Sequence, residues 1–387
     1  MTAQRIVWID WLRVTAIFLV IIVHSTEPFY LGGEGSLIMT ASDAFWVALF
    51  DTFARACVPL FIIASSFLQF PLRYSTATFF KRRAVRVLVP FAVWTTVYAL
   101  IWGEPIQNFK DLLLNFNYAA GHLWFVYMLV GIYLLMPMLS PWAERVSKRE
   151  LQVYLTICFF TTIIPFARTY FGGEVPVIYG PSGIPNPAKF PLWGEASWNT
   201  YGVFYYFSGF IGYLLFGLYV RRFVTNLSRP TSLILSIVPF VTGFIICFFG
   251  FLHYVYASAT NGFPVEGPVG MAALWETPWF NDTTGVALMA IGWVFFYRHI
   301  TSSGRFFNNI LLPLSGASYG LYLCHMIILV PVSAWLRSKL GLGSDGVLSV
   351  WTTPAQIVGT AIITFILGSL ASVVVGRIPR LGKYLMG

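Results

Sequence analysis

Apolar residues run along the chain in stretches of about 20, separated by short segments that carry most of the charges. A hydrocarbon layer about 30 Å thick requires a spanning helix of about that length. Because lipid offers the backbone no hydrogen-bond partner, each stretch must be helical. The pattern predicts an all-α, polytopic membrane helix bundle with about ten transmembrane helices. They begin near Ile6, Ala44, Val85, His122, Leu151, Gly202, Ser232, Thr283, Asn309 and Pro354.

The composition agrees with this pattern. Of the 387 residues, 57% are hydrophobic and 10% are charged, which is more apolar than a soluble core of this size can absorb. No internal repeat, low-complexity linker or soluble domain is visible, so residues 1–387 are expected to form a single integral membrane domain. Asp10 and Arg13 interrupt the first stretch and no small-residue cleavage site follows. We therefore expect a first span there, not a signal peptide.

The cations decide the predicted orientation. With a cytoplasmic N-terminus, seventeen of the 24 Lys and Arg residues fall in inner segments, and only Lys110, Lys189, Arg337 and Lys339 fall in outer ones. Such a bias marks cytoplasmic loops, so both the N- and C-termini are predicted to be cytoplasmic. Because the basic residues are dispersed over several inner segments, the net charge of +9 is a topology signal and nucleic acid is not an expected partner.

Two outer connections are unusually long, at residues 171–198 and 256–282. Connections of this length are often lids or binding elements. Their tryptophans Trp193, Trp198, Trp275 and Trp279 suit stacking on sugar rings, but we expect them to anchor the chain at the bilayer interface. The outer segments also carry many carboxylates, which disfavours a polyanionic acceptor.

Ionisable side chains inside spans cost a few kcal/mol each, so they are expected to face the bundle interior and either pair or take part in function. They are Asp10, Arg13, His24, Asp51, Arg55, Arg168 and His325. The spacings from Asp10 to Arg13 and from Asp51 to Arg55 allow each pair to neutralise itself on one helix face. For these four residues, helix stabilisation and a functional role remain equally open.

Arg13 and His24 lie eleven positions apart, which is about three helical turns, so they share a face and are separated by about 16 Å along the axis. The face presents a guanidinium towards the inner leaflet and an imidazole towards the outer boundary. A lone buried histidine is often a packing residue. We expect instead that both side chains point into one shared, water-accessible passage.

A second arginine motif begins the third span. Arg83 and Arg86, in the segment KRRAVRVLVPF, share a helix face at the inner membrane surface. Planar guanidiniums at that depth suit phosphate groups, through bidentate hydrogen bonds. The alternative is the ordinary anchoring that any inner loop provides.

Weaker candidates lie near the outer face. His122 opens the fourth span with Tyr127 about one turn later, and His325 lies in the outer half of the ninth span. Packing explains each of them about as well as a site does. The four cysteines, Cys57, Cys158, Cys247 and Cys324, have no metal-ligand spacing, so they are expected to be buried apolar filler and no metal site is predicted.

Five segments occur in the order found in one known family: IDWLRVTAIFLVIIVH, RACVPLFIIASSF, FFKRRAVRVLVPF, GHLWFVYMLVGIYLLMPML and SYGLYLCHMIIL. Together they resemble the acyltransferase-3 group of integral membrane O-acyltransferases, over nearly the whole chain. The first carries a D-x-x-R and the R-x10-H spacing, and the third carries an R-x-x-R. One departure is Ser66, where a glycine is expected. Because the residue is still small, the departure bears on helix contact more than on chemistry.

The resemblance implies transfer of an acyl group, commonly acetyl from acetyl-CoA, to a hydroxyl of a cell-envelope polysaccharide or glycolipid, at a bacterial inner (plasma) membrane. It implies that His24 is the catalytic histidine, that Arg13 is its partner, and that Arg83 and Arg86 hold CoA phosphates. The residues fit these roles, since a cytoplasmic donor meets arginines at the inner surface. An imidazole with an ordinary pKa of about 6.5 suits proton removal from a hydroxyl at neutral pH. Whether His24 acts as the base or carries the acyl group stays open, and so does the oligomeric state.

Three other functions compete with this one. Polar groups in spans also mark the pathways of a transporter or a flippase of lipid-linked glycan, but the paired broken helices and inverted repeats common in transporters are not evident. A glycan polymerase would use the long outer connections and need no CoA site. A non-catalytic assembly subunit would need only the helices.

Overall fold

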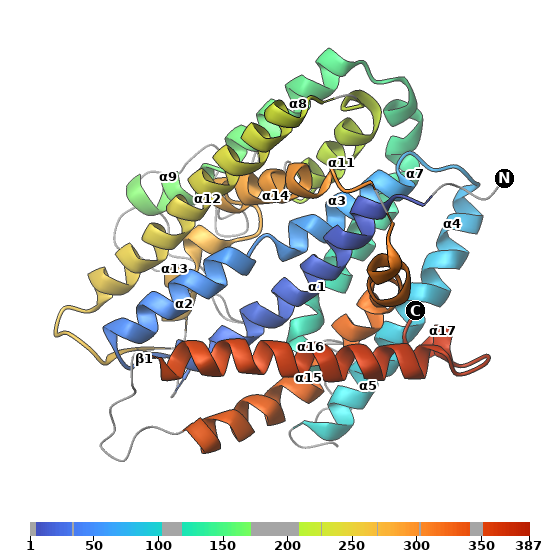
Figure 1. Cartoon of the computed structure of the whole chain (residues 1–387). Coiled ribbons are helices and arrows are strands. Elements are labelled where there is room, and N and C mark those ends of the chain that lie inside the picture. The colour runs from blue at the N-terminus through green and yellow to red at the C-terminus, as the bar shows by residue number, and fades with distance from the viewer. Residues whose placement is uncertain are drawn as a thin grey trace.

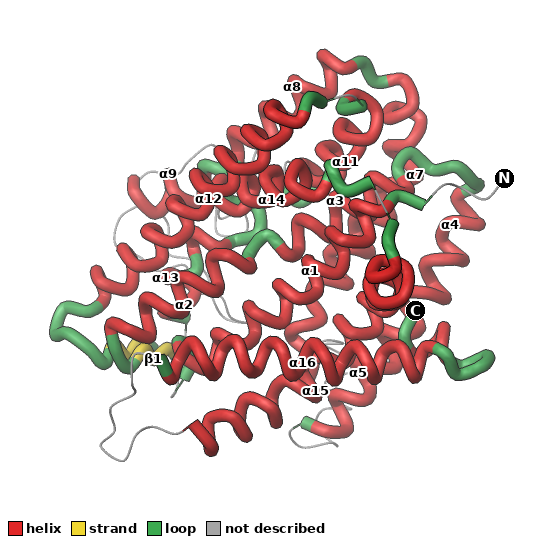
Figure 2. Tube along the Cα trace, in the orientation of Figure 1, coloured by secondary structure: helices red, strands yellow, loops and turns green. Residues whose placement is uncertain are grey.

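The computed structural model describes residues 5–32, 35–102, 118–171, 209–225, 227–268, 270–301, 303–340 and 351–387. Within these ranges the chain is mostly helical, and Figure 2 shows the short paired strands at one end of the bundle. Both termini lie at the other end, on the right of Figure 1. We call the end where the first helix begins the N-terminal end, and the opposite end the distal end.

The helices and strands are named as in Figure 1. The first half of the described chain contains α1 (Val7–Thr26), the 3₁₀ turn η1 (Glu27–Phe29), β1 (Ser36–Ile38), α2 (Ala41–Ala54), α3 (Cys57–Gln69), α4 (Thr76–Arg83), the π-helix η2 (Ala84–Leu88), α5 (Val89–Ile101), the 3₁₀ segment η3 (Tyr118–Leu123), α7 (Trp124–Arg145), α8 (Lys148–Thr161) and α9 (Ile164–Phe171). The second half contains α11 (Ile211–Phe223), α12 (Arg229–Ser258), β2 (Val265–Gly267), α13 (Met271–Trp275), the 3₁₀ turn η4 (Thr277–Trp279), α14 (Thr284–Tyr297), the π-helix η5 (Phe307–Leu311), α15 (Leu312–Leu340), α16 (Thr352–Gly376) and α17 (Gly382–Leu385).

Eight stretches of the described chain are long and apolar enough to cross a membrane. They are Val7–Phe29, Ala41–Gln69, Thr76–Ile101, Ala120–Arg145, Lys148–Ala167, Arg229–Ser258, Phe307–Leu340 and Thr352–Gly376. These stretches confirm the predicted all-α polytopic bundle and correspond to eight of its ten spans.

The predicted span that begins near Gly202 lies partly outside the described residues, which contain its second part as α11, with 13 residues. The predicted span that begins near Thr283 differs from expectation. α14 has 14 residues and is about 21 Å long, shorter than the roughly 30 Å of a spanning helix. Its apolar run is short because Thr283 is extended and Arg298 follows its last turn.

α1 is the central helix of the bundle. It contacts α2, α3, α14, α15 and α16, and most of its residues are buried. A helix that is apolar on nearly every face is stable when it is enclosed on all sides. The few polar residues of α1 are therefore held inside the protein, which is where a site can form.

Both π-helices precede a proline by two residues. Pro90 has no N–H, and its ring would clash with the carbonyl of Arg86 in a regular helix. The chain widens there, and Val89 N–H bonds to Ala84 O five residues back. Pro313 follows η5 in the same way. The R-x-x-R motif thus crosses from an α-helix into a π-helix, which its spacing alone did not indicate.

The second long connection folds back into the bundle. β2 pairs antiparallel with β1, with Leu37 opposite Glu266. Trp275 and Trp279 are fully buried in the protein, so the prediction that they anchor the chain at the bilayer interface is wrong. The indole of Trp279 stacks on Phe251 with centroids 3.9 Å apart and donates to Thr52 Oγ1 over 2.9 Å. Trp193, Trp198 and nearly all of the first long connection lie outside the described residues.

Ser66 lies at a close helix contact, as its small size suggested. Its hydroxyl donates to Leu214 O of α11, and a Cβ on Gly217 would lie 2.6 Å from the Cβ of Ser66. The four cysteines are buried and free, in agreement with their expected role as apolar filler.

Candidate active site

A cavity of about 430 Å³ opens at the N-terminal end and gathers the arginines that the sequence singled out. We call it the arginine cavity. It is lined by Arg5 and Arg13 around α1, Ser65 and Gln69 of α3, Arg83 and Arg86 of the R-x-x-R motif, Phe125 and Tyr133 of α7, and Gly316, Ser318, Tyr319 and Tyr322 of α15. Residues 13, 83 and 86, which lie far apart along the chain, thus surround one space, as the phosphate-binding prediction requires.

Arg13, Arg83 and Arg86 carry the positive charge of the cavity. Within the described part of the chain, none of the three pairs with a carboxylate. Arg13 Nη2 donates to Ser318 Oγ over 3.0 Å. The guanidinium of Arg83 lies over the ring of Tyr133 at 5.3 Å, and its buried Nε has no hydrogen-bond partner. The cavity therefore presents positive charge and spare donors to an anionic ligand.

The predicted pairing of Asp10 with Arg13 is not observed. Asp10 receives two hydrogen bonds from Arg5, at 2.8 and 2.9 Å, and one from Ser315 Oγ at 2.5 Å. Arg5 lies in the segment before α1, and its side chain folds back to bond Asp10. Arg13 therefore bonds Ser318 instead of Asp10, and the bond from Ser315 to Asp10 links α15 to α1.

Three histidines meet near the distal end of α1. The ring centroid of His24 lies 5.2 Å from that of His325 and 6.4 Å from that of His122, and the last two lie 5.4 Å apart. His325 is fully buried, and its Nδ1 lies 2.6 Å from Tyr322 O. The buried Nε2 atoms of His122 and His325 have no hydrogen-bond partner. The three candidates, separated in sequence, form one cluster.

Glu27 is a site residue that sequence reasoning missed. His24 Nδ1 lies 2.8 Å from Glu27 Oε1, across one helical turn. The available signal was the (i, i+3) spacing of the two residues. A carboxylate on Nδ1 holds the proton on that nitrogen, which leaves Nε2 with a free lone pair.

His24 lines an open groove of about 550 Å³ at the distal end, which we call the His24 groove. The groove runs between η1 and the second half of α15, and its lining includes Glu27, Met326, Leu329, Ser333 and Arg337. Arg337 donates to Pro28 O over 3.0 Å and has no carboxylate partner among the described residues. The residues that line the groove are mainly apolar, and Arg337 places a cation in it.

The expectation of one shared passage for Arg13 and His24 is wrong. Arg13 lines the arginine cavity and His24 lines the separate groove. Between them, Tyr322 packs 5.7 Å from Phe125 and 5.8 Å from His325. On α1 itself, Ile17 and Val20 occupy the shared face and are buried. A partition of aromatic and apolar side chains therefore separates the two polar ends.

The Asp51–Arg55 pair is confirmed, and it belongs to a larger network. Arg55 bonds both carboxylate oxygens of Asp51 and reaches Glu276 over 3.1 Å. Tyr30 donates to Glu276, and Thr26 at the end of α1 donates to Asp51 over 2.8 Å. These bonds hold the second long connection against the distal end of α1, beside His24.

Tyr127 is not the ring that contacts His122. Tyr98 takes that place, with centroids 4.6 Å apart, whereas Tyr127 is 42% exposed and packs on Phe91 at 5.2 Å. His122 belongs to the 3₁₀ segment η3, whereas Tyr127 lies on α7, so the two residues do not share one regular helix. The side chain of Arg168 lies outside the described residues.

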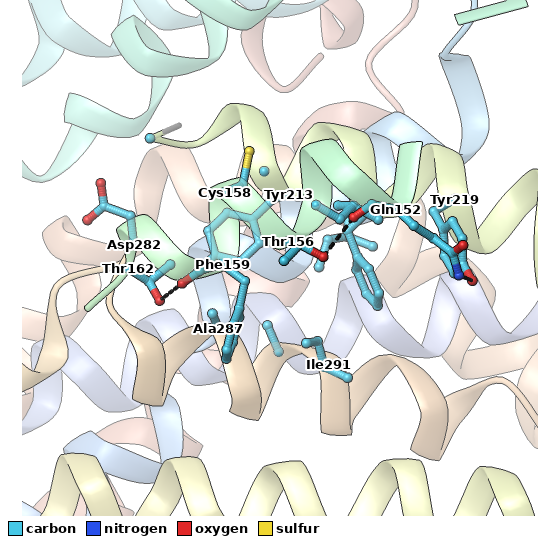
Figure 3. A pocket seen from close by; sticks show the side chains of 16 residues that line it. Gln152, Thr156, Cys158, Phe159, Thr162, Tyr213, Tyr219, Asp282, Ala287 and Ile291 are labelled. Carbon is cyan, nitrogen blue, oxygen red and sulfur yellow. Dashed lines mark hydrogen bonds between the residues drawn. The ribbon is translucent and has the colours of Figure 1, made fainter. Parts of the chain in front are cut away.

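A third cavity, of about 430 Å³, lies between α8, α11 and α14 (Figure 3). It is mostly apolar. Gln152 bonds the hydroxyl of Tyr219 at one end, and Thr162 and Asp282 lie at the other. None of the predicted site residues lines it. Among the described residues no group of His, Cys, Asp and Glu is arranged to hold a metal ion.

Comparison with known proteins identifies the family of the chain. Searches among curated proteins and among solved structures each gave no significant match. A family model described as an acyltransferase domain matches residues 6–373, which includes the arginine motif, the histidine cluster and most of the described helices. The chain therefore belongs to the acyltransferase-3 family and is a multi-pass integral membrane acyltransferase.

Proposed function

We propose that the protein is an O-acyltransferase that moves an acyl group from a cytoplasmic acyl-CoA to a hydroxyl of an envelope polysaccharide or glycolipid. The acyl group that we propose is acetyl. The N-terminal end of the bundle would then face the cytoplasm, and the membrane would be the bacterial inner membrane. The observation that carries the proposal is the arginine cavity, where three arginines without carboxylate partners among the described residues surround one space.

The donor is proposed to bind in the arginine cavity. CoA carries a diphosphate, which Arg83 and Arg86 suit because guanidiniums bind phosphate oxygens in a bidentate manner. Arg13 lies about 16 Å along α1 from His24 and lines a different cavity. We therefore assign Arg13 to donor binding, not to stabilising charge at the reacting carbonyl as its sequence pairing with His24 suggested.

His24 is proposed as the general base. Its Nε2 takes the proton of the acceptor hydroxyl as the oxygen attacks the thioester carbonyl carbon, and the C–S bond then breaks. The imidazolium returns the proton to the departing CoA thiolate, so the ester and free CoA are the only products. Glu27 holds Nδ1 and stabilises the imidazolium while it exists.

The acceptor is proposed to approach through the His24 groove. The groove meets His24 from the distal end and carries an apolar lining with Ser333 and Arg337. The thioester arrives from the opposite side, so the partition formed by Tyr322 and Phe125 must open when the donor is bound. His122 and His325 are proposed to support His24, and Asp10, Asp51 and Arg55 hold the helices that carry the site.

The test uses purified protein in proteoliposomes with acetyl-CoA labelled in the acetyl group and envelope glycan as acceptor. Wild-type protein should transfer label to glycan, and His24→Ala should abolish transfer with membrane level and melting temperature near wild type. Retained transfer in His24→Ala would remove the catalytic role of the histidine.

The same assay separates the competing functions. Movement of glycan across the vesicle without labelled product would favour a flippase. Glycan elongation without CoA binding would favour a polymerase. Mass analysis of envelope polysaccharide from cells with and without the chain identifies the acceptor.

A further inference from the structure

A second cationic cavity adjoins the arginine cavity. It has a volume of about 460 Å³ and lies where the end of α16 and α17 meet the R-x-x-R segment and α15. We call it the α17 cavity. Its lining includes Arg86, Gly316, Ser372, Arg377, Lys383 and Met386.

The two cavities share part of their walls. Arg86 of η2, Gly316 of α15 and Gly387 line both. A Cβ placed on Gly316 meets no atom within 4 Å, so the space beside this residue is open. A ligand bound in one cavity can therefore extend past Gly316 into the other.

The floor of the α17 cavity is held in place by packing. Trp94 of α5 donates its indole N–H to Leu385 O over 2.7 Å. Met386 is 6% exposed, and a Cβ on Gly320 would lie 2.8 Å from the Cβ of Met386. Because α17 is fixed to α5 and α15, Arg377 and Lys383 are carried on a defined surface.

Cationic side chains gather around the combined space, which Gly387 also lines. Arg86, Arg377 and Lys383 line the α17 cavity, and within the described part of the chain none of them pairs with a carboxylate. In the adjoining arginine cavity, the buried Nε of Arg83 has no hydrogen-bond partner. Arg86, Arg377 and Lys383 are exposed, so water solvates their charges and they are free to meet an anionic ligand. The buried Nε of Arg83, in contrast, is costly unless a ligand accepts its hydrogen bond.

We propose, on the basis of the function proposed above, that the α17 cavity binds the 3′-phosphorylated ribose of the acyl-CoA donor, with Arg377 and Lys383 on the 3′-phosphate. CoA has two anionic regions, the diphosphate and the 3′-phosphate, joined by the ribose. Arg86 and Gly316 lie at the junction of the cavities, where the diphosphate would cross. The pantetheine arm then extends into the arginine cavity, towards Arg13 and Ser318.

The test compares acetyl-CoA with acetyl-dephospho-CoA, which lacks only the 3′-phosphate. For the wild type, we expect KM for acetyl-dephospho-CoA to be about tenfold higher or more, the effect of losing a hydrogen bond to a charged group. Arg377→Ala should raise KM for acetyl-CoA by a similar factor and leave KM for acetyl-dephospho-CoA unchanged. Arg380→Ala removes a cation of the same connection that lines neither cavity, and it should change neither value.

Each other outcome has a distinct meaning. If the wild type uses both donors equally, or if Arg377→Ala raises both KM values alike, the 3′-phosphate assignment is overturned. If Arg377→Ala acts only in nanodiscs that contain anionic lipid, the cavity binds a lipid headgroup and the assignment also fails. If the wild type transfers acetyl from neither donor and binds no CoA, the proposed function itself fails.

A steric variant tests the junction independently. Gly316→Leu has room for its Cβ, so the fold should persist, but the side chain would enter the junction. It should raise KM for acetyl-CoA at an unchanged melting temperature. Gly131→Leu is the matched control, because its Cβ also meets no atom within 4 Å and Gly131 lines neither cavity. Equal KM values for the two variants would show that no ligand crosses at Gly316.

Discussion

At the scale of single residues, the chemistry proposed for this protein depends on how one imidazole is held. The Nδ1 of His24 lies 2.8 Å from Glu27 Oε1, and its ring centroid lies 5.2 Å from that of the buried His325. The carboxylate fixes the proton on Nδ1, so Nε2 can act as a base. The two unpartnered Nε2 atoms nearby, of His122 and His325, give the site further polar groups inside an otherwise apolar region.

Glu27→Gln should lower kcat by about ten- to a hundredfold, because the neutral amide no longer stabilises the imidazolium, and a general base contributes about 10²–10⁴ in all. KM for acetyl-CoA should stay near wild type, since Glu27 does not line the arginine cavity. Steady-state kinetics check both values. Glu150→Gln is the control, because Glu150 also accepts a single hydrogen bond, from Trp142, and lies away from the site. A wild-type kcat for Glu27→Gln would show that Glu27 does not assist His24.

At the scale of secondary-structure elements, close helix contacts set the frame in which the site residues stand. α3 carries Ser65 and Gln69 into the arginine cavity on one face and packs on α11 through Ser66 on another. Gly217 makes that approach possible, because a Cβ there would lie 2.8 Å from Ile63 O as well as 2.6 Å from Ser66 Cβ. Small residues at helix contacts are the usual way for membrane helices to approach closely.

Gly217→Ala should lower the thermal stability of the detergent-solubilised protein, since overpacking a tight contact costs about 1–3 kcal/mol. The melting temperature from intrinsic fluorescence is the measurement. Gly131→Ala should leave it unchanged or slightly raised, because no atom lies within 4 Å of its Cβ and alanine favours helix. Equal melting temperatures for the two variants would contradict the tight α3–α11 contact.

The R-x-x-R segment gives a second prediction at this scale. Arg83→Ala with Arg86→Ala should weaken CoA binding by at least about tenfold and flatten its salt dependence, because charge-assisted contacts to phosphate are lost. Titration of the purified protein with CoA at two salt concentrations measures both effects. Arg82→Ala is a matched control, since Arg82 lies over Tyr74 and lines neither cavity. Unchanged CoA affinity in the double variant would show that the motif does not bind the CoA phosphates and serves only to orient the chain in the membrane.

At the scale of the whole molecule, a buried ion network joins segments that lie far apart in sequence. Arg55 in the break between α2 and α3 meets Asp51, Tyr30 and Glu276, and its guanidinium lies 4.7 Å from the ring centroid of Trp279. Removing one member of such a buried pair leaves a charge without a partner, which is strongly destabilising. The network thus fixes the second long connection over the bundle beside His24.

Glu276→Gln should loosen that connection while the bundle stays folded, because Arg55 keeps its bonds to Asp51. Hydrogen exchange of the amides in α13 and η4 should become several-fold faster. Glu266→Gln changes an exposed residue of β2 in the same connection, so it is the control and should leave exchange there unchanged. Identical exchange in the two variants would show that the Glu276 contact does not hold the connection.

The sequence by itself determined the helical bundle and eight of its spans, and it singled out the arginines and histidines that the fold gathers, but not Glu27. Hydrophobic length and the need to satisfy backbone groups in lipid are local properties, and they can be read from a single chain. The Asp51–Arg55 pair was readable for the same reason, because four residues on a helix is a fixed distance. Asp10 was mispaired because Arg5, which lies outside the regular helix, had no predictable direction.

Only the tertiary structure decided which distant residues meet and which are kept apart. The three histidines come from α1, η3 and α15, and spacing along the chain holds no information on that contact. The separation of Arg13 from His24 depends on Tyr322 and Phe125, side chains of other helices that fill the space between them. Helix periodicity sets the face on which a side chain lies, but packing against neighbouring helices decides whether that face lines a cavity or is covered by other side chains.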